Sequence, residues 1–254
     1  MCLILIAYRA HAAYPLVIAA NRDEYYRRPT AQAAYWADHS HVLAGRDLEC
    51  MGTWLGVTRD GRFAALTNFR DPREHKADAP SRGHLVSDFL VSNLNPRTYL
   101  ESIKDGASRY NGFNLLLGDA DGVFCFSSRE SAAQELPPGI HGLSNHLLNT
   151  PWPKVVRGKR RLQQTLARGP DTDALLQLLA DRDPAPEGEL PNTGVGAERE
   201  SLLSPALIAS PEYGTRASTV LLVGSDAGVR FTERTILPGG IAGSTVSLTF
   251  SLKA

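Results

Sequence analysis

Short apolar segments separated by tight turns dominate this sequence of 254 residues, and they most constrain its fold. Segments such as residues 2–8 and 113–117 are apolar on successive positions, as in strands that are buried on both faces. The turns at residues 59–61 and 119–122 are hairpin signals, which favour antiparallel pairing. Antiparallel strands buried on both faces need two packed sheets with helices over their outer faces. The sequence therefore predicts an α+β fold, a four-layer α-β-β-α sandwich of two antiparallel sheets.

The same patterns predict where the individual elements lie. Strands are expected at residues 2–8, 15–20, 54–58, 62–69, 113–117, 123–127, 219–223, 229–232 and 245–252. Helices are expected at residues 84–94, from 96 to about 110 behind Asn95 as N-cap, at 152–167 and at 172–182. Residues 183–200 are rich in proline and glycine and predict a lid or a flexible loop. No repeat or linker divides the chain, so one domain over residues 1–254 is expected.

Composition and charge exclude several classes of protein. Lys plus Arg and Asp plus Glu are both 27, which gives no sign of binding to nucleic acid or an anionic membrane. No segment approaches the roughly 20 apolar residues of a transmembrane helix, and the N-terminus lacks the basic region of a secretory signal. The three cysteines, Cys2, Cys50 and Cys125, have no metal-type spacing and argue against a disulfide framework. A reducing, cytoplasmic location without a bound metal is therefore expected.

Cys2 is the first candidate for chemistry. It directly precedes a buried strand, and its small side chain makes removal of Met1 chemically plausible. A thiol with a pKa of ~8.5 beside its own α-amine of ~7.7–8.0 would form a compact unit of nucleophile and base. A buried apolar cysteine in the first strand is the alternative interpretation.

A charged cluster follows the second predicted strand. Residues 16–20 continue into Asn21, Arg22, Asp23 and Glu24. If the strand continues, Asn21 and Asp23 face one side and Arg22 and Glu24 the other, so only one pair reaches a given cavity. A solvated strand end with weak surface ion pairs is the alternative interpretation.

Several separated motifs together resemble one family. They are Cys2 at the extreme N-terminus, NRDE at residues 21–24, LTNFR at 66–70, GLSN at 142–145 and YGTRAST at 213–219. This ordered set, which spans most of the chain, resembles the NRDE family, which includes the eukaryotic transport and Golgi organisation proteins. That family is similar in turn to N-terminal nucleophile (Ntn) hydrolases of the cholylglycine hydrolase and penicillin V acylase group. The resemblance implies the same four-layer sandwich.

The resemblance also implies a set of site residues. The catalytic positions that match are Cys2, Arg22, Asp23, Asn145 and Arg216, and the substrate-binding positions are Asn21, Asn68, Arg70 and His146. Cys2 would attack an amide carbonyl while Asp23 orients its amine, Arg22 holds the thiolate and Asn145 donates to the oxyanion. Arg216 would complete the electrostatic setting or bind a substrate carboxylate. The hydrolases usually separate the Arg and the Asp on their second strand, whereas Arg22 and Asp23 are adjacent here.

A ligand carrier is the alternative function. Relatives in eukaryotes and bacteria are associated with haem trafficking, so haem as a bound ligand is the alternative to an enzyme without cofactor. The histidines available are His11, His39, His41, His75, His84, His141 and His146, none of them in a haem-attachment motif. The basic run at residues 157–161 suits an anionic group such as the phosphates of an acyl-CoA, or else a solvated helix face. Either function predicts a small-molecule partner and leaves the oligomeric state open.

Overall fold

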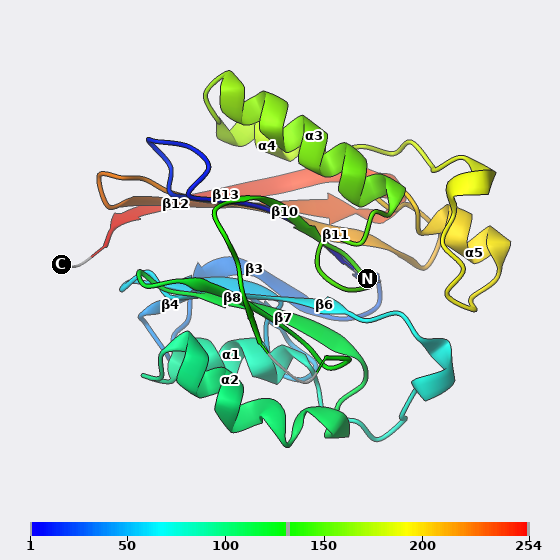
Figure 1. The fold of residues 1–254 in the computed structure, drawn as a ribbon, viewed down its shortest axis with the longest axis horizontal. Coiled ribbons are helices and arrows are strands. Elements are labelled where there is room, and N and C mark those ends of the chain that lie inside the picture. Colours follow the sequence, from blue (N-terminus) through cyan, green and yellow to red (C-terminus); the bar gives the residue numbers. More distant parts are fainter. Residues whose placement is uncertain (1, 131–132, 253–254) are drawn as a thin grey trace. The chain divides into compact units, whose positions relative to one another are not determined.

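The computed structural model describes residues 2–130 and 133–252, and for Cys2 it describes the backbone only. The chain divides into two compact units (Figure 1). Unit 1 contains Met1–Arg27, Pro138–Ser144 and Leu148–Phe250, and unit 2 contains Arg28–Pro137, Asn145–Leu147 and Ser251–Ala254. Each unit is therefore assembled from segments that lie far apart in the sequence.

Unit 1 is built on a six-stranded sheet with the order β10-β1-β2-β11-β12-β13. The strands are β1 (Cys2–Tyr8), β2 (Leu16–Tyr25), β10 (Gly139–Leu143), β11 (Tyr213–Val223), β12 (Gly228–Leu237) and β13 (Ile241–Ser251). The pairings from β10 through to β12 are all antiparallel. The N-terminal hairpin β1–β2 thus lies inside the sheet, between two strands from the second half of the chain.

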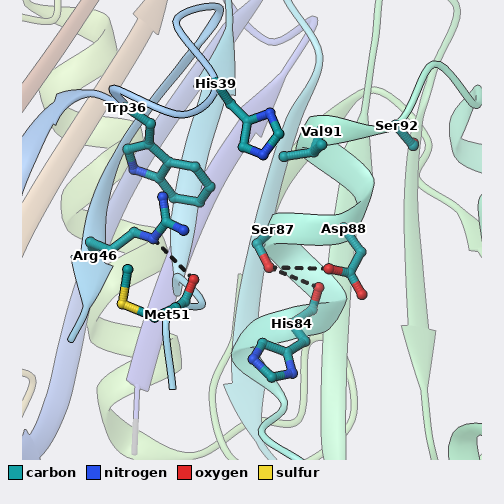
Figure 2. A pocket seen from close by; sticks show the side chains of 9 residues that line it. All are labelled: Trp36, His39, Arg46, Met51, His84, Ser87, Asp88, Val91 and Ser92. Atoms are coloured by element: carbon teal, nitrogen blue, oxygen red, sulfur yellow. Dashed lines mark hydrogen bonds between the residues drawn. The ribbon is translucent and has the colours of Figure 1, made fainter. Parts of the chain in front are cut away.

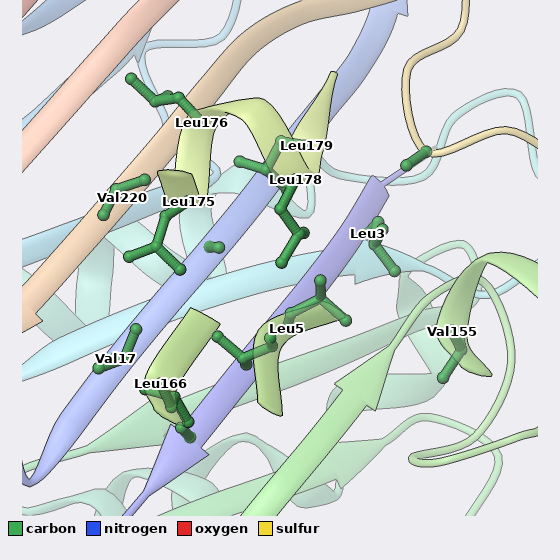
Figure 3. Packing of buried hydrophobic residues seen from close by; sticks show 14 of the residues in the cluster. Leu3, Leu5, Val17, Val155, Leu166, Leu175, Leu176, Leu178, Leu179 and Val220 are labelled. Atoms are coloured by element: carbon green, nitrogen blue, oxygen red, sulfur yellow. The ribbon is translucent and has the colours of Figure 1, made fainter. Parts of the chain in front are cut away.

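Two helices cover one face of this sheet, α3 (Pro153–Ala167) and α4 (Thr172–Leu179). Alternate residues of the central strands, such as Leu5, Val17 and Val220, pack against Leu166 and Leu175 of these helices (Figure 3). The strand residues between them, such as Ile4 and Ile18, are equally buried on the opposite face of the sheet. Burial on both faces explains why these strands are apolar at successive positions.

Unit 2 is built on a seven-stranded sheet with the order β3-β4-β5-β6-β7-β8-β9, in which every pair of neighbours is antiparallel. The strands are β3 (Thr30–Tyr35), β4 (Val42–Asp47), β5 (Leu55–Thr58), β6 (Phe63–Asn68), β7 (Phe113–Gly118), β8 (Val123–Ser127) and β9 (Gln134–Glu135). Helices α1 (Gly83–Val91) and α2 (Pro96–Lys104) pack on one face through Phe89 and Leu100. The predicted α+β class, with two antiparallel sheets and helices over a face of each, is confirmed.

The remaining elements are short. They are α5 (Ala197–Leu202) and the 3-10 turns η1 (Pro72–Glu74), η2 (Ala107–Arg109), η3 (Glu187–Glu189) and η4 (Pro238–Gly240). The segment 183–200, predicted as a lid or loop, contains η3 and the start of α5. Within it the buried carboxylate of Glu200 accepts hydrogen bonds from the amide and the hydroxyl of Thr193. No helix in the described part of the chain is both long and apolar enough to span a membrane.

The structure corrects some predicted boundaries. The helix expected from residue 96 to about 110 begins as predicted, with the Asn95 side chain accepting from the amide of Thr98. It ends at Lys104, because Asp105 and Gly106 follow and the chain continues into η2. Strands β2 and β11 extend well beyond their predicted apolar stretches, into the NRDE and YGTRAST motifs. These extensions place the motif residues on rigid strands.

Candidate functional site

The first group of predicted site residues lies in unit 1, where β1, β2 and β11 run side by side. Cys2 is the first residue of β1, and its register partner on β2 is Arg22. Arg22 is in turn opposite Ala217 of β11, and its side chain is only 7% exposed. The side chain of Cys2 lies outside the described part of the structure, so its predicted chemistry stays a prediction. The register places its backbone directly across from a buried guanidinium residue.

Asn21 lies on the helix-covered face of the same sheet. Its amide nitrogen donates to the carbonyls of Leu179 and Ala206, at 2.9 and 2.8 Å. Its amide oxygen accepts from the hydroxyl of Ser218 at 2.7 Å. With both amide N–H groups and the oxygen engaged, Asn21 connects β2 and β11 to the end of α4 and to the segment before β11. The structure thus gives this predicted substrate-binding residue a position inside the core.

Asp23 shares the face of Asn21, whereas Arg22 lies on the other face, as the alternation of a strand requires. The carboxylate of Asp23 is 3% exposed and accepts from the hydroxyl of Thr215 at 2.6 Å. That hydroxyl also accepts from the amide of Ile208 at 2.9 Å. Asp23 therefore belongs to a buried chain of hydrogen bonds that includes Thr215 and the backbone before β11.

Arg216 occupies an irregularity in β11. The register with β2 shifts between Thr215 and Ala217, so Arg216 is the extra residue of a β-bulge. Its guanidinium donates to the carbonyl of Tyr25 at 2.8 Å and lies 6.0 Å from the centre of the Tyr26 ring. A bulge changes the direction in which its side chains point, and the Thr215–Asp23 hydrogen bond lies directly beside this one.

The second group lies in unit 2, at the end of β6. The side-chain amide of Asn145 donates to the carbonyl of Asn68 at 2.8 Å, and the amide of Arg70 donates to the carbonyl of Asn145 at 2.8 Å. The ring of His146 lies 5.0 Å from the ring of Phe69. The sequence analysis named all four polar residues, three of them within the motifs at 66–70 and 142–145, and the structure brings them together. Asn145 is fully buried, and Arg70 is 8% exposed.

The sequence analysis did not identify three residues that form hydrogen bonds with the predicted site residues. Thr215 and Ser218 bind Asp23 and Asn21, and Asn114 donates to the carbonyl of His146 at 2.9 Å and to Thr67 at 3.0 Å. Thr215 and Ser218 lie within the YGTRAST motif. The register shift that brings them to their partners leaves no signal in hydrophobic periodicity. Asn114 is a polar residue within a buried strand, which is itself a signal that a specific hydrogen-bond partner is needed.

The histidines and basic residues named for the carrier alternative are dispersed. His39 and His41 are neighbours with ring centres 6.2 Å apart, and His41 contacts the carbonyl of Leu90 at 3.2 Å. Among the described residues, no group of three or more His, Cys, Asp or Glu side chains is arranged to hold a metal ion. In the basic run, Arg157 and Arg161 both pair with Asp181, at 3.7 and 3.1 Å. Binding of haem or of an acyl-CoA stays a prediction.

A cavity of about 430 Å³ lies in unit 2 on the helix side of its sheet (Figure 2). One side of α1 lines it, and the opposite wall is formed by Trp36, His39, Arg46 and Met51. The Arg46 guanidinium stacks 3.8 Å from the Trp36 ring centre and forms two hydrogen bonds to Asp38. Its charge is thus already compensated. The cavity contains none of the residues that the sequence analysis assigned to the site.

A match over most of the chain shows the family to which it is related. Residues 1–238 match the family described as Transport and Golgi organisation 2 (TANGO2). The chain belongs to the TANGO2 family. A "Transport and Golgi organization protein 2 homolog" of Bos taurus is 38% identical, over 93% of this chain and 94% of its own length. The human homolog is 36% identical over the same shares of the two chains, and the Drosophila melanogaster protein is 29% identical over 93% and 92%.

Two solved structures show the fold of this TANGO2-family chain. The mutant C2A conjugated bile acid hydrolase from Clostridium perfringens matches with a TM-score of 0.53, over 99% of this chain and 92% of its own, at 7% identity. The Caenorhabditis elegans ortholog of N-acylethanolamine-hydrolyzing acid amidase matches with a TM-score of 0.50, over 87% and 92%, at 12% identity. At these identities the likeness shows the fold alone, which is that of Ntn amidohydrolases.

Proposed function

We propose that this TANGO2-family chain is an Ntn-type cysteine amidohydrolase that cleaves a small N-acyl amide through Cys2. The observation that carries the proposal is the register of unit 1, which sets Cys2 opposite the buried Arg22 at the start of a rigid central strand. A cysteine gains reactivity beside a positive charge, because the charge stabilises the thiolate and lowers the thiol pKa. The likeness to two amidohydrolases of the same fold supports the proposed reaction class.

The reaction follows from the chemistry of an N-terminal cysteine. Once Met1 is removed, the neutral α-amine of Cys2 accepts the thiol proton, and the thiolate attacks the amide carbonyl to form a C–S bond. The tetrahedral intermediate collapses when the ammonium group returns that proton to the leaving nitrogen and the C–N bond breaks. A water molecule, deprotonated by the same amine, then attacks the thioester carbonyl. The C–S bond breaks, the ammonium group returns the proton to the Cys2 sulfur, and the carboxylic acid is released.

The other predicted residues enter this proposal with distinct roles. Arg22 stabilises the thiolate. The roles expected for Asn145 as an oxyanion donor, a contact that is often worth about 3 kcal/mol, and for Asn68, Arg70 and His146 in substrate binding stay predictions. Asp23 and Thr215 act as positioning residues through the bulge that carries Arg216. The predicted contact of Asp23 with the amine of Cys2 stays a prediction.

Cys125 serves as an internal contrast to Cys2. Burial raises the pKa of the Cys125 thiol to about 12, and Glu130 adds to the rise. At neutral pH this thiol is fully protonated, so it is a poor nucleophile. Substitution of Cys125 or of the partly exposed Cys50 should therefore leave amide hydrolysis unchanged.

The experiment that tests the proposal joins a mass measurement to an activity assay. Intact mass of the protein from its native host shows whether Cys2 is the terminal residue. Amides of a fluorogenic amine with short, medium and long acyl chains are then offered to the native protein, to Cys2→Ala and to Cys50→Ala. We expect hydrolysis by the native protein and by Cys50→Ala, and at least a 1,000-fold loss in Cys2→Ala, on the order of a catalytic nucleophile's contribution.

Two results would overturn the proposal. One is retention of Met1, because the base would then be an amide nitrogen without basicity. The other is equal turnover by Cys2→Ala and the native protein. Mass spectrometry can also detect the acyl group that becomes attached to the protein, and this readout does not depend on how fast the product is released. The trapped mass should map to Cys2 and be absent from Cys2→Ala.

A further inference from the structure

The cavity beside α1 has a size that suits a small organic molecule. Its volume of about 430 Å³ lies within the range of roughly 300–1,000 Å³ that is usual for ligand pockets. All of its lining residues belong to unit 2, and none of them is among the residues proposed for amide hydrolysis. The chemistry of its walls therefore bears on a separate function.

The wall formed by α1 presents hydrogen-bond acceptors. His84, Ser87 and Asp88 are spaced three and four residues apart, so they share one side of the helix (Figure 2). Nε2 of His84 lies 2.6 Å from the carbonyl oxygen of Cys50. Because a carbonyl oxygen can only accept, Nε2 carries the proton, and Nδ1 of the neutral ring is an acceptor.

Ser87 and Asp88 add further acceptors to the same wall. The single hydroxyl hydrogen of Ser87 is directed to the carbonyl of His84 at 3.1 Å or to the carboxylate of Asp88 at 3.4 Å. The lone pairs of the Ser87 oxygen stay available, and an ionised carboxylate accepts without donating. The three side chains thus offer a ligand several acceptors, while their own donors are already engaged.

The charges around the cavity are unequally compensated. On the wall opposite α1, the Arg46 guanidinium donates to both carboxylate oxygens of Asp38, at 2.9 and 3.0 Å, which balances its charge. Asp88 forms no ion pair with any lysine or arginine in the described part of the chain. Partial burial raises the pKa of the Asp88 carboxyl, and His84 and Ser87 only partly offset the rise. The cavity therefore has one carboxylate whose charge lacks a basic partner.

We propose that this cavity binds a small organic ammonium ion, a protonated primary amine with a short apolar body. Such an ion has three N–H donors and no acceptor on its charged group, so it matches a wall of acceptors. Its charge compensates that of Asp88. Met51, which is 51% exposed, and the half-buried Val91 supply apolar surface for the hydrocarbon part of the ligand.

The position of Asp88 limits the affinity. The residue as a whole is exposed, and ion pairs that water reaches contribute little to binding. For a ligand of the size of phenethylamine, we expect a dissociation constant on the order of 1–10 mM. The ion pair should account for a difference of at least about threefold between this amine and an uncharged analogue.

The test compares three probes that share a phenyl ring and differ in charge, namely phenethylamine, phenethyl alcohol and hydrocinnamate. Each is titrated at about pH 8, where the amine is charged and an ordinary histidine is neutral. The proteins are the native chain, Asp88→Asn and Asp105→Asn, and binding is followed by the NMR shifts of the amides of residues 83–92. Asp105→Asn is the matched control, because it removes an exposed carboxylate at the end of α2 that does not line the cavity.

We expect phenethylamine to bind the native chain and Asp105→Asn equally, and Asp88→Asn at least about threefold more weakly, with unchanged circular dichroism spectra. Phenethyl alcohol should bind the native chain at least about threefold more weakly than the amine, and hydrocinnamate should leave these amide signals in place.

Three results would overturn the proposal. The first is the absence of any shift with phenethylamine at concentrations up to about 20 mM. The second is binding of the alcohol or of hydrocinnamate that equals or exceeds that of the amine. The third is an affinity for the amine that Asp88→Asn leaves unchanged. Because no arm of this test measures amide hydrolysis, its outcome is independent of the role proposed for Cys2.

Discussion

Replacement of Asn21 separates a structural role from the substrate-binding role that the sequence predicted. Asn21→Ala removes three hydrogen bonds, to Leu179, Ala206 and Ser218, from a site that is 1% exposed. A typical buried hydrogen bond contributes about 1 kcal/mol net, and an unsatisfied buried partner raises the cost. The loss should therefore be about 3–5 kcal/mol, a large part of the stability of an ordinary domain.

The assay is urea unfolding followed by circular dichroism, with the midpoint and the slope compared between variants. Asn21→Asp is a near-isosteric companion, because a carboxylate cannot donate to the carbonyls of Leu179 and Ala206 and should destabilise at least as strongly. Asn93→Ala, at an exposed position, is the matched control and should change the free energy of unfolding by less than about 0.5 kcal/mol. If Asn21→Ala costs less than about 1 kcal/mol but abolishes amide hydrolysis, the structural argument is wrong.

Three further predictions concern other parts of the chain. Partial desolvation raises the pKa of the Asp88 carboxyl, although the residue as a whole is exposed, and His84 and Ser87 partly offset the rise. Its ionised form therefore slightly disfavours the folded state, and the melting temperature of Asp88→Asn relative to the native chain should rise modestly as the pH increases above 3.8. A Cβ at Gly214 would collide with the Tyr26 hydroxyl and lie 2.6 Å from the carbonyl of Ile208, so Gly214→Ala should cost about 1–3 kcal/mol in urea unfolding, partly recovered by Tyr26→Phe. At pH 8 a thiol reagent should leave Cys125 unmodified until urea unfolds the chain, and labelling in the folded state would contradict its raised pKa.

The fold was largely predictable from sequence because two signals, an apolar run and a flanking turn, indicate many of its strands. Residues 2–8 and 113–117 are apolar at successive positions, and turn residues such as Gly61, with its positive φ of 88°, mark the hairpins between strands. Strands β3 and β4 were missed because residues such as Thr30 and Arg46 interrupt any apolar run. Their place in the sheet depends on long-range pairing, which local propensity does not encode.

The sequence predicted which residues belong to the candidate site much better than it predicted how they are arranged in space. The motifs correctly grouped Asn68 with Asn145, which are hydrogen-bonded. Sequence alternation also anticipated that Arg22 and Asp23 face opposite sides. The bulge at Arg216 and the burial of Asn21 against Leu179 could not be predicted, because both arise from contacts between segments more than 150 positions apart.

The interleaved connectivity of the two units imposes an order on synthesis and folding. Most of unit 2 is one continuous segment, Arg28–Pro137, so its sheet can form while the ribosome is still making the remainder. The hairpin β1–β2 emerges first, yet its sheet partners β10 and β11 begin only at Gly139 and Tyr213. Until then its apolar strands have unpaired edges, which makes the nascent chain vulnerable to aggregation and a client for chaperones. A nonsense mutation before residue 139 would leave Cys2 on a hairpin that has neither of its partner strands.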